Sequence, residues 1–309
     1  GKPESSPPFA GPPGVPGPPF DHAMTSASAN AATSAVQGSV VLNGNDFQLA
    51  PDTPRLGRAR GTVTFTETGF ALAGVQARLL GGDVRLDGGS VPAAPGVTGA
   101  RSMPSVVLRA QGAITADALR QARELGLLAR LAQRASGTTS YAATLDFRRG
   151  HPEILFSSNL TGLALDLPAP FNKAADAALP LRVETALQRE SLQPGPAGQV
   201  RLRDQIRLDV GRLASATFVR DISAQEPRVL RGAIGVGLTG DESAPLPDDG
   251  VVANVNLNRL DVDAWSEVMT QASGATLSAS APASQYMPAS LAVRAREFQM
   301  GDRKSTRLN

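Results

Sequence analysis

Residues 61–89 read GTVTFTETGFALAGVQARLLGGDVRLDGG, and this stretch decides the fold. Val63 and Phe65 alternate with threonines, which is the period-two pattern of a strand that has one apolar and one polar face. Gly74 shifts the alternation by one residue, as a β-bulge does, and a Gly-Gly pair further on is typical of a tight turn. The stretch therefore predicts a meander of short antiparallel strands.

The same alternation recurs along the chain and predicts a mainly β fold. Strand-like segments follow one another at spacings of roughly ten to fifteen residues, about twelve to fourteen in all, which is typical of all-β architecture. Two helical patterns interrupt them. TADALRQARELGLLARLAQRA at residues 115–135 begins with Thr115 as its N-cap. DVDAWSEVMTQAS at residues 261–273 has Asp263 in the same role.

The two ends of the chain depart from this pattern. Residues 1–35 are rich in Pro, Ala and Ser, and they have too little apolar surface to offset the entropy of ordering. We therefore expect a disordered linker there. The last eight residues, DRKSTRLN at 302–309, match the translation of a common sequencing-adapter oligonucleotide. We predict that residues 36–301 are the folded segment and that residues 302–309 are an artefact.

The overall charge gives no reason to expect a nucleic-acid partner. The chain has 30 basic and 28 acidic residues and a pI of about 9.4. The adapter-like segment holds three of the basic and one of the acidic residues, which leaves 27 of each in the rest. Without net charge, the rest of the chain has no broad basic surface of the kind that DNA and RNA binders use.

The composition also limits cross-links and membrane spans. There is no cysteine, which excludes disulfides and thiolate metal sites. No run of about 18 apolar residues occurs, so we expect no membrane-spanning helix in this segment. Because the sequence opens on Gly1 rather than Met, we expect the natural start, with its anchor or signal, to lie upstream.

Catalytic patterns are missing from the sequence. The two histidines, His22 and His151, fall in the predicted linker and in a turn, without the rigid support that a catalytic or metal-binding histidine needs. Asp166 and Lys173 flank a Pro-Ala-Pro bend, and we interpret them as a surface ion pair. No nucleotide-binding loop is present. The sequence therefore predicts a protein that is not an enzyme and needs no cofactor or metal.

Four segments carry a resemblance to a known family. Besides the opening stretch they are SSNLTGLALDLPAPFNKAADAALPLRVE at 157–184, RGAIGVG at 231–237 and LNRLDVDAWSEVM at 257–269. Together they resemble the YhdP proteins, which belong to the AsmA-like group of Gram-negative envelope proteins. The resemblance covers about residues 36–301, and S-N-L-x-G-L-x-L-D-L-P-A-P is its most specific block. It implies that the chain is an internal fragment of such a protein.

The resemblance implies an elongated antiparallel β-sheet curled into a groove, with two short helices. Family members have an N-terminal inner-membrane helix and a long periplasmic β-structure, which is implicated in moving phospholipid between the inner and outer membranes. The chain would be a periplasmic portion of such a protein, with phospholipid and both membranes as partners and passive transfer as its mechanism. The expected apolar lining of the groove comprises Val63, Phe65, Leu72, Val84, Leu86, Leu108, Leu145, Phe147, Phe156, Leu163, Leu165, Leu167, Leu181 and Val183.

Two alternatives stay open on the residues alone. The same alternation builds ordinary sandwich cores, in which a second sheet covers the apolar face. A periplasmic scaffold or regulator of outer-membrane assembly, which binds envelope proteins through strand edges and not lipid, fits the pattern as well. A continuous apolar row with no second layer opposite it would favour the groove. For the groove we also expect Leu165→Asp to impair lipid binding far more than Lys173→Ala.

Overall fold

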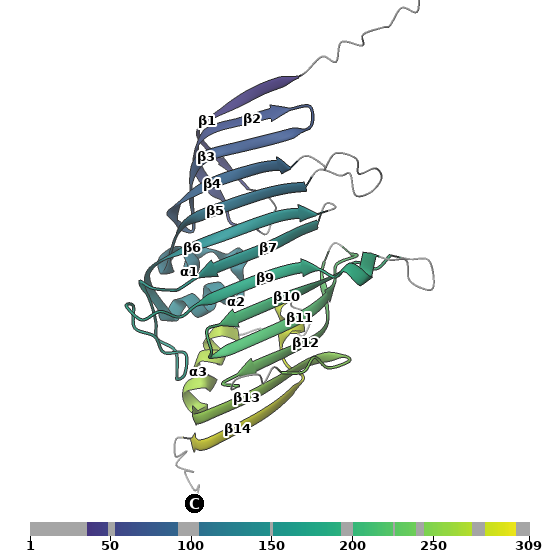
Figure 1. Ribbon diagram of the computed structural model, residues 1–309. Coiled ribbons are helices and arrows are strands. Elements are labelled where there is room, and N and C mark those ends of the chain that lie inside the picture. The colour runs from purple at the N-terminus through teal and green to yellow at the C-terminus, as the bar shows by residue number, and fades with distance from the viewer. Residues whose placement is uncertain are drawn as a thin grey trace, which may run out of the picture. The chain divides into compact units, whose positions relative to one another are not determined.

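The computed structural model describes residues 36–48, 53–91, 105–148, 151–192, 200–224, 226–238, 244–273 and 282–300 (Figure 1). They form a 14-stranded sheet. Its strands are β1 Gln37–Phe47, β2 Leu56–Thr66, β3 Gly69–Leu79, β4 Gly81–Val91, β5 Ser105–Thr115, β6 Ala135–Arg148, β7 His151–Ser158, β8 Leu163–Leu165, β9 Leu181–Leu187, β10 Arg203–Val210, β11 Ala214–Asp221, β12 Arg228–Val236, β13 Gly250–Asp261 and β14 Ser290–Gln299. The predicted linker at 1–35 and the adapter-like segment at 302–309 lie outside the described residues.

The sheet is single, open and curled, as predicted, and its strand order follows the chain from β1 to β14. Only β8 leaves this path, because it pairs with the beginning of β6 alone. Neighbours are antiparallel from β1 as far as β12. β12, β13 and β14 then pair in parallel, which differs from the purely antiparallel prediction. Parallel neighbours need long crossovers, and residues 237–249 and 262–289 make these two connections.

The predicted β-bulge in β3 is present. Leu72 pairs with Gly88 and Val75 with Leu86, so one extra residue is accommodated on β3 between the two pairs. Gly74 provides it with a φ of 61°, a left-handed conformation that glycine adopts without strain. The bulge keeps Leu72 and Val75 on the same face of the sheet, as the shifted alternation in the sequence indicated.

The helical segments are short, and the first predicted helix is broken. They are α1 Ala116–Gln121, η2 Arg123–Leu125, α2 Leu127–Leu131, η3 Ala132–Arg134, η4 Arg189–Leu192, α3 Val262–Ser273 and η5 Pro282–Tyr286. Thr115 is the N-cap of α1, as predicted, because its Oγ1 accepts a hydrogen bond from the Ala118 amide at 3.2 Å. The helix does not continue to residue 135, because Ala122 takes a ψ of 78° that ends α1, and Gly126 interrupts the segment again with a φ of 55°.

The N-cap of α3 lies two residues earlier than predicted. The Oδ1 atom of Asp261 accepts a hydrogen bond from the Ala264 amide at 2.9 Å, whereas Asp263 lies in the first turn. Either aspartate stabilises the positive end of the helix dipole, and this is why sequence alone did not separate them.

Helix α3 spans the curl of the sheet. It follows β13, yet Glu267 accepts a hydrogen bond at 2.8 Å from Arg134, which lies just before β6. Trp265 Nε1 also donates to the Ala169 carbonyl at 3.1 Å. Six strand spacings separate β6 from β13, an arc of about 29 Å, whereas a helix of this length measures about 18 Å. The helix therefore closes the arc as a chord, at the end of the strands where Figure 1 shows the helices gathered.

Candidate functional site

One continuous apolar row crosses the sheet. Residues that pair directly across neighbouring strands point to the same face, so the register defines such rows. We call this one the inner row, and its side of the sheet the inner face. It crosses eleven strands without a polar side chain. Its members from β3 to β14 are Val75, Leu86, Ala110, Ala143, Phe156, Val183, Leu208, Ala216, Ile234, Ala253 and Leu291.

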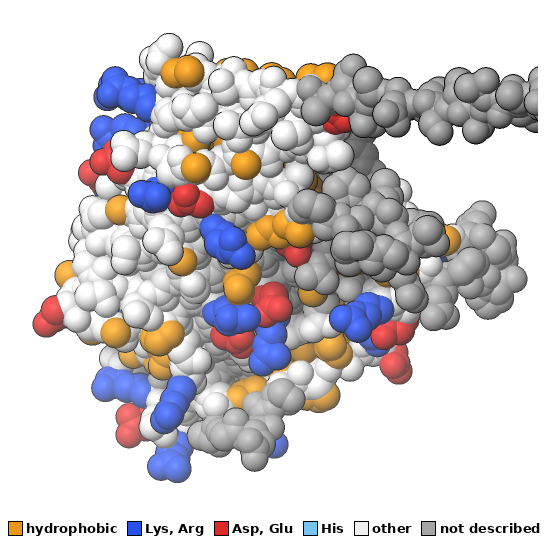
Figure 2. All heavy atoms as spheres, turned by 45° about the horizontal axis from the view of Figure 1, so that its top comes forward, with side chains coloured by type: hydrophobic (Ala, Val, Ile, Leu, Met, Phe, Trp, Pro, Cys, Tyr) orange, Lys and Arg blue, Asp and Glu red, His pale blue; other side chains and the backbone are white. Residues whose placement is uncertain are grey.

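The neighbouring row faces the other way and is polar. We call it the outer row, and its side the outer face. The only apolar side chains in this row are alanines. Figure 2 shows basic and acidic side chains interspersed over one face of the molecule. Its members are Gln76, Arg85, Gln111, Ala142, Ser157, Arg182, Asp209, Ser215, Gly235, Asn254 and Ala292.

The chain itself covers the inner face at two places. At the helical end, Leu119 of α1 packs against a cluster that includes Val84 and Tyr141. Over β10–β13, which we call the covered section, Tyr286 of η5 packs edge-on against Phe218, with ring centroids 5.1 Å apart and an interplanar angle of 81°. At both places the core consists of strand side chains, and a helical segment rather than a second sheet packs on them.

Four inner-face side chains on β5, β6, β7 and β9 belong to neither of these cores. Leu108 pairs with Leu145, and Leu145 with Ile154, while Val183 continues the face on β9. None of the four belongs to a packed hydrophobic cluster of the described residues, and Ile154 is 41 % exposed. We call these four residues the open section.

Most of the predicted lining residues lie on the inner face. Their contact with lipid stays a prediction. Val84 is the most buried of them, at 2 % exposed, and Phe65 the most exposed, at 39 %. Those on the inner face are Val63, Phe65, Leu72, Val84, Leu86, Leu108, Leu145, Phe147, Phe156, Leu181 and Val183.

Three predicted lining residues lie elsewhere. Leu163 and Leu165 are in β8, which pairs only with the beginning of β6, and Leu167 is in the loop that follows. Leu163 is 4 % exposed and packs with Ala116 and Ala135 in a separate core. Their period-two spacing is that of a strand, but this strand helps to close the helical end and does not extend the inner row.

Lys173 is buried at the helical end, next to β8. Its side chain is 6 % exposed, and its Nζ donates to the carbonyl oxygens of Leu163 at 2.6 Å and Ala174 at 2.9 Å. Burial lowers the pKa of the ammonium. The interpretation of Lys173 and Asp166 as a surface ion pair is therefore wrong. Leu165→Asp and Lys173→Ala would both disturb the packing at the helical end, so the comparison of these two variants does not test the open section.

A charged pair that the sequence analysis missed lies on the inner face in the covered section. Arg220 donates to Asp204 through Nε at 3.0 Å and Nη2 at 2.5 Å, and to the Tyr286 hydroxyl through Nη1 at 3.2 Å. Burial alone would lower the pKa of the guanidinium, but these hydrogen bonds outweigh burial and raise it. The available signal was a charge at an apolar position, because Asp204 precedes Ile206 by two residues.

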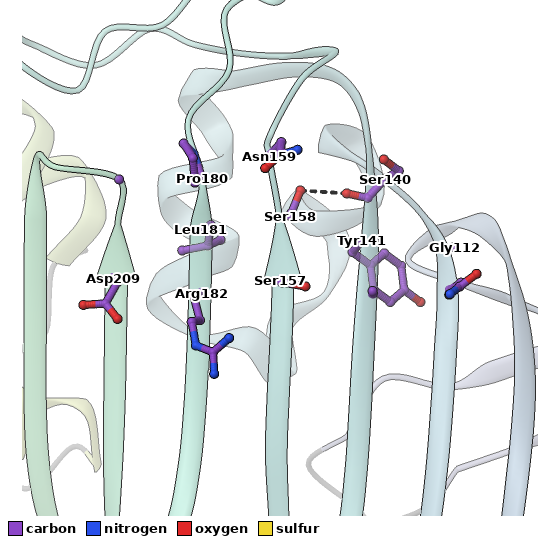
Figure 3. Close-up of a pocket in the computed structure, with 13 residues that line it drawn as sticks. Gly112, Ser140, Tyr141, Ser157, Ser158, Asn159, Pro180, Leu181, Arg182 and Asp209 are labelled. Carbon is purple, nitrogen blue, oxygen red and sulfur yellow. Dashed lines mark hydrogen bonds between the residues drawn. The ribbon is translucent and has the colours of Figure 1, made fainter.

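A hollow of about 570 Å³ is lined by residues of β5, β6, β7, β9 and β10 (Figure 3). Arg182 and Asp209 line it from neighbouring strands, together with Ser157. Each of the two charged residues pairs within its own strand, Arg182 with Glu184 at 2.9 Å and Asp209 with Arg207 at 3.2 Å. Tyr141 and Leu181 share the lining with these polar side chains, and its charges are balanced.

The described residues contain neither a metal-binding group nor a membrane-spanning helix. No group of three or more His, Cys, Asp or Glu side chains in the described ranges is placed to hold a metal ion. None of the helices found there is both long and apolar enough to cross a bilayer.

The fold and the inner row define a class of mainly β proteins in which one curled sheet has a continuous apolar row, with no second sheet opposite it in the described residues. The family model described as YhdP protein matches residues 25–309, and the chain therefore belongs to the YhdP family of Gram-negative envelope proteins. No curated protein and no solved structure matches the chain.

Proposed function

We propose that the chain is a periplasmic segment of an inner-membrane-anchored protein. It holds the acyl chains of phospholipid along its inner row and lets them pass between the inner and outer membranes without a chemical step. The observation that carries this proposal is the unbroken apolar register from Val75 to Leu291, which lies opposite no second sheet in the described residues.

The energetics favour such a row. A lipid with two acyl chains of roughly thirty methylenes would cost about 25 kcal/mol to expose to water, at about 0.8 kcal/mol for each methylene. A polar residue in the lining would add a local barrier of a few kcal/mol, because it would have to lose its water without gaining a partner. Ten strand spacings make the inner row about 48 Å long, which exceeds the hydrocarbon thickness of a bilayer, about 30 Å.

The open section lies on the same inner face, beside the inner row and including its member Val183, and it is there that we expect lipid to bind. The residues at its two ends are already covered by the chain, by Leu119 at one end and by Tyr286 at the other. Leu145 lies at its centre, paired on both sides with apolar residues, Leu108 and Ile154. The polar headgroup would remain in solvent beyond the ends of the strands.

A pair of matched variants tests the proposal. Leu145→Asn changes the inner face, whereas Leu155→Asn makes the same change on the outer face of the adjacent strand, where Leu155 pairs with Glu184. Both leucines are half-buried. The full chain is expressed with a periplasmic signal, and co-purified phospholipid is measured by native mass spectrometry and solvent extraction. We expect near-stoichiometric lipid in the parent chain and in Leu155→Asn, and at least a five-fold loss in Leu145→Asn.

Two outcomes would contradict the proposal. A folded, β-rich parent chain without lipid would favour the alternative of a scaffold or regulator that binds envelope proteins. Equal lipid in the two variants would mean that the lipid is not held on the inner face.

A further inference from the structure

A cluster of arginines lies on the outer face of β2–β5. Arg58 and Arg60 of β2, with Arg78 of β3 and Arg85 of β4, line one hollow of about 500 Å³. Arg109 of β5 lies next to it on the same face. All five side chains are exposed. We call these five residues the arginine cluster.

The charge of this cluster is not balanced. Arg78 pairs with Asp83 at 3.6 Å, and Arg85 pairs with Asp87 at 3.0 Å. Within the described part of the chain, the other three arginine side chains have no hydrogen-bond or ion-pair partner. One further carboxylate, Asp46, lies beside the cluster. Its Oδ1 atom accepts a hydrogen bond from the backbone amide of Arg58 at 2.7 Å. Five positive charges thus face three negative ones.

The backbone of β2 is strained where it contributes to the cluster. Gly57 pairs with Arg78 and Arg60 with Gln76, so Arg58 and Ala59 together oppose a single residue of β3. Arg58 takes a φ of 53°, a left-handed conformation that is unfavourable for any residue with a side chain such as arginine. Ala59 is 0 % exposed on the inner face, while Arg58 lines the outer hollow. Bulges often redirect a side chain at functional sites, and strain there points to a role for the residue.

We propose that the arginine cluster binds the phosphate groups of anionic lipids at a membrane surface. Guanidinium groups match the geometry of phosphate oxygens and bind them through paired hydrogen bonds. The cluster extends over four strands, about 14 Å, and is shallow and exposed. Those dimensions fit an array of headgroups better than one small enclosed ligand. The inference does not rest on lipid binding in the groove, because the cluster lies on the opposite face.

Vesicle binding by the full chain tests the inference. The probes are phosphatidylcholine vesicles and vesicles in which about one third of the lipid is phosphatidylglycerol. We expect binding only with the anionic lipid, and a steep fall as salt is raised. The double variant Arg58→Gly/Arg60→Gln should lower the partition coefficient roughly 20-fold, since one basic residue near such a surface contributes about five-fold.

The matched control removes the same charge elsewhere on the outer face. Arg182 and Arg207 both point outward, and each is already paired with a carboxylate of its own strand. Arg182→Gln/Arg207→Gln should therefore lower vesicle binding by less than about three-fold.

Arg58→Gly alone separates loss of the site from loss of the fold. Glycine adopts the left-handed conformation without strain, so the melting temperature should stay the same or rise. Binding to anionic vesicles should nevertheless fall about five-fold, because one charge is removed.

Three results would overturn the inference. They are an equal loss of binding in the two double variants, equal binding to phosphatidylcholine vesicles, and displacement by inorganic phosphate at an ionic strength at which chloride has no effect. The last result would assign the cluster to a small phosphate ligand. Leu145→Asn should leave vesicle binding unchanged, so failure of the groove proposal and failure of this one are distinguishable.

Discussion

The open section and the covered section belong to one face of one sheet, yet the chain treats them differently. In the covered section Phe218 is 8 % exposed, because Tyr286 packs on it. In the open section Ile154 is 41 % exposed, and no described residue packs over it in a hydrophobic cluster. Both sections have the same alternation of apolar and polar residues, so the difference lies in what covers them.

This difference shows how apolar surface can be assigned to stability or to binding. Where the chain's own aromatic ring covers the face, truncation removes core contacts and lowers the free energy of unfolding. Where nothing covers the face, truncation removes little from the fold but changes what a ligand would contact. The predictions below address this assignment, from the largest expected effect to the smallest.

Phe218→Ala should lower the free energy of unfolding by about 3 to 4 kcal/mol, because it removes a buried ring and leaves a cavity. Leu145→Ala, in the open section, should lower it by about 1 kcal/mol, because the side chain is only half-buried. Urea unfolding followed by circular dichroism measures both values. Equal losses would show that the open section is packed as a core, which contradicts the assignment.

Asp204→Ala should destabilise the covered section by about 2 to 3 kcal/mol, since it leaves the Arg220 guanidinium largely buried without its carboxylate. The matched control is the double variant Asp204→Ala/Arg220→Met, which removes the second charge as well. We expect the double variant to regain most of the lost stability in the same unfolding experiment. If the double variant were less stable than Asp204→Ala, the pair would contribute through packing rather than charge.

Tyr141→Phe should raise the free energy of unfolding by about 1 kcal/mol. Tyr141 lies on the inner face beside the open section, stacked on Phe156 at 5.5 Å, and its hydroxyl is buried without a hydrogen-bond partner among the described residues. Removing an unsatisfied buried hydroxyl relieves its desolvation cost. Unfolding at neutral pH measures the gain, and a loss of stability would mean that a water or ligand satisfies this hydroxyl.

Tyr141→Phe should also change how the free energy of unfolding depends on pH. Burial raises the pKa of Tyr141 to about 12. An unfolded tyrosine titrates near pH 10, so the unfolded state loses its proton first as the pH rises. The stability of the parent chain should therefore fall between about pH 10 and pH 12, and Tyr141→Phe should lack this part of the fall.

The strands were predictable because their signals are local. Gly74 marked its bulge through the shifted alternation, and Thr115 marked a helix start through its position before an apolar period. The open section was likewise present in the alternation that includes Leu108 and Leu145. What the alternation does not encode is whether a second layer covers it, since that depends on segments far away in sequence, such as the one with Tyr286.

The failures come from non-local pairing. Period two is the same in parallel and antiparallel strands, so Ile234 and Ala253 gave no sign of their parallel register. The length of the crossover at residues 237–249 was the available signal, because a hairpin needs far fewer residues. Leu163 had the spacing of a lining residue, but its strand, β8, pairs only with the beginning of β6. Its partner, Gly137, lies 26 positions earlier in the chain.

The contact between Arg134 and Glu267 joins residues 133 positions apart, whereas most strands of the sheet pair with their immediate successors. Contacts between distant positions form late in folding, because a long loop must close before they are gained. We therefore expect the early strands to assemble in order as the chain emerges, and α3 to dock last. The helical end would then be the last part of the molecule to fold. Truncation before residue 262 would leave a sheet whose strands pair but whose curl is not held by α3.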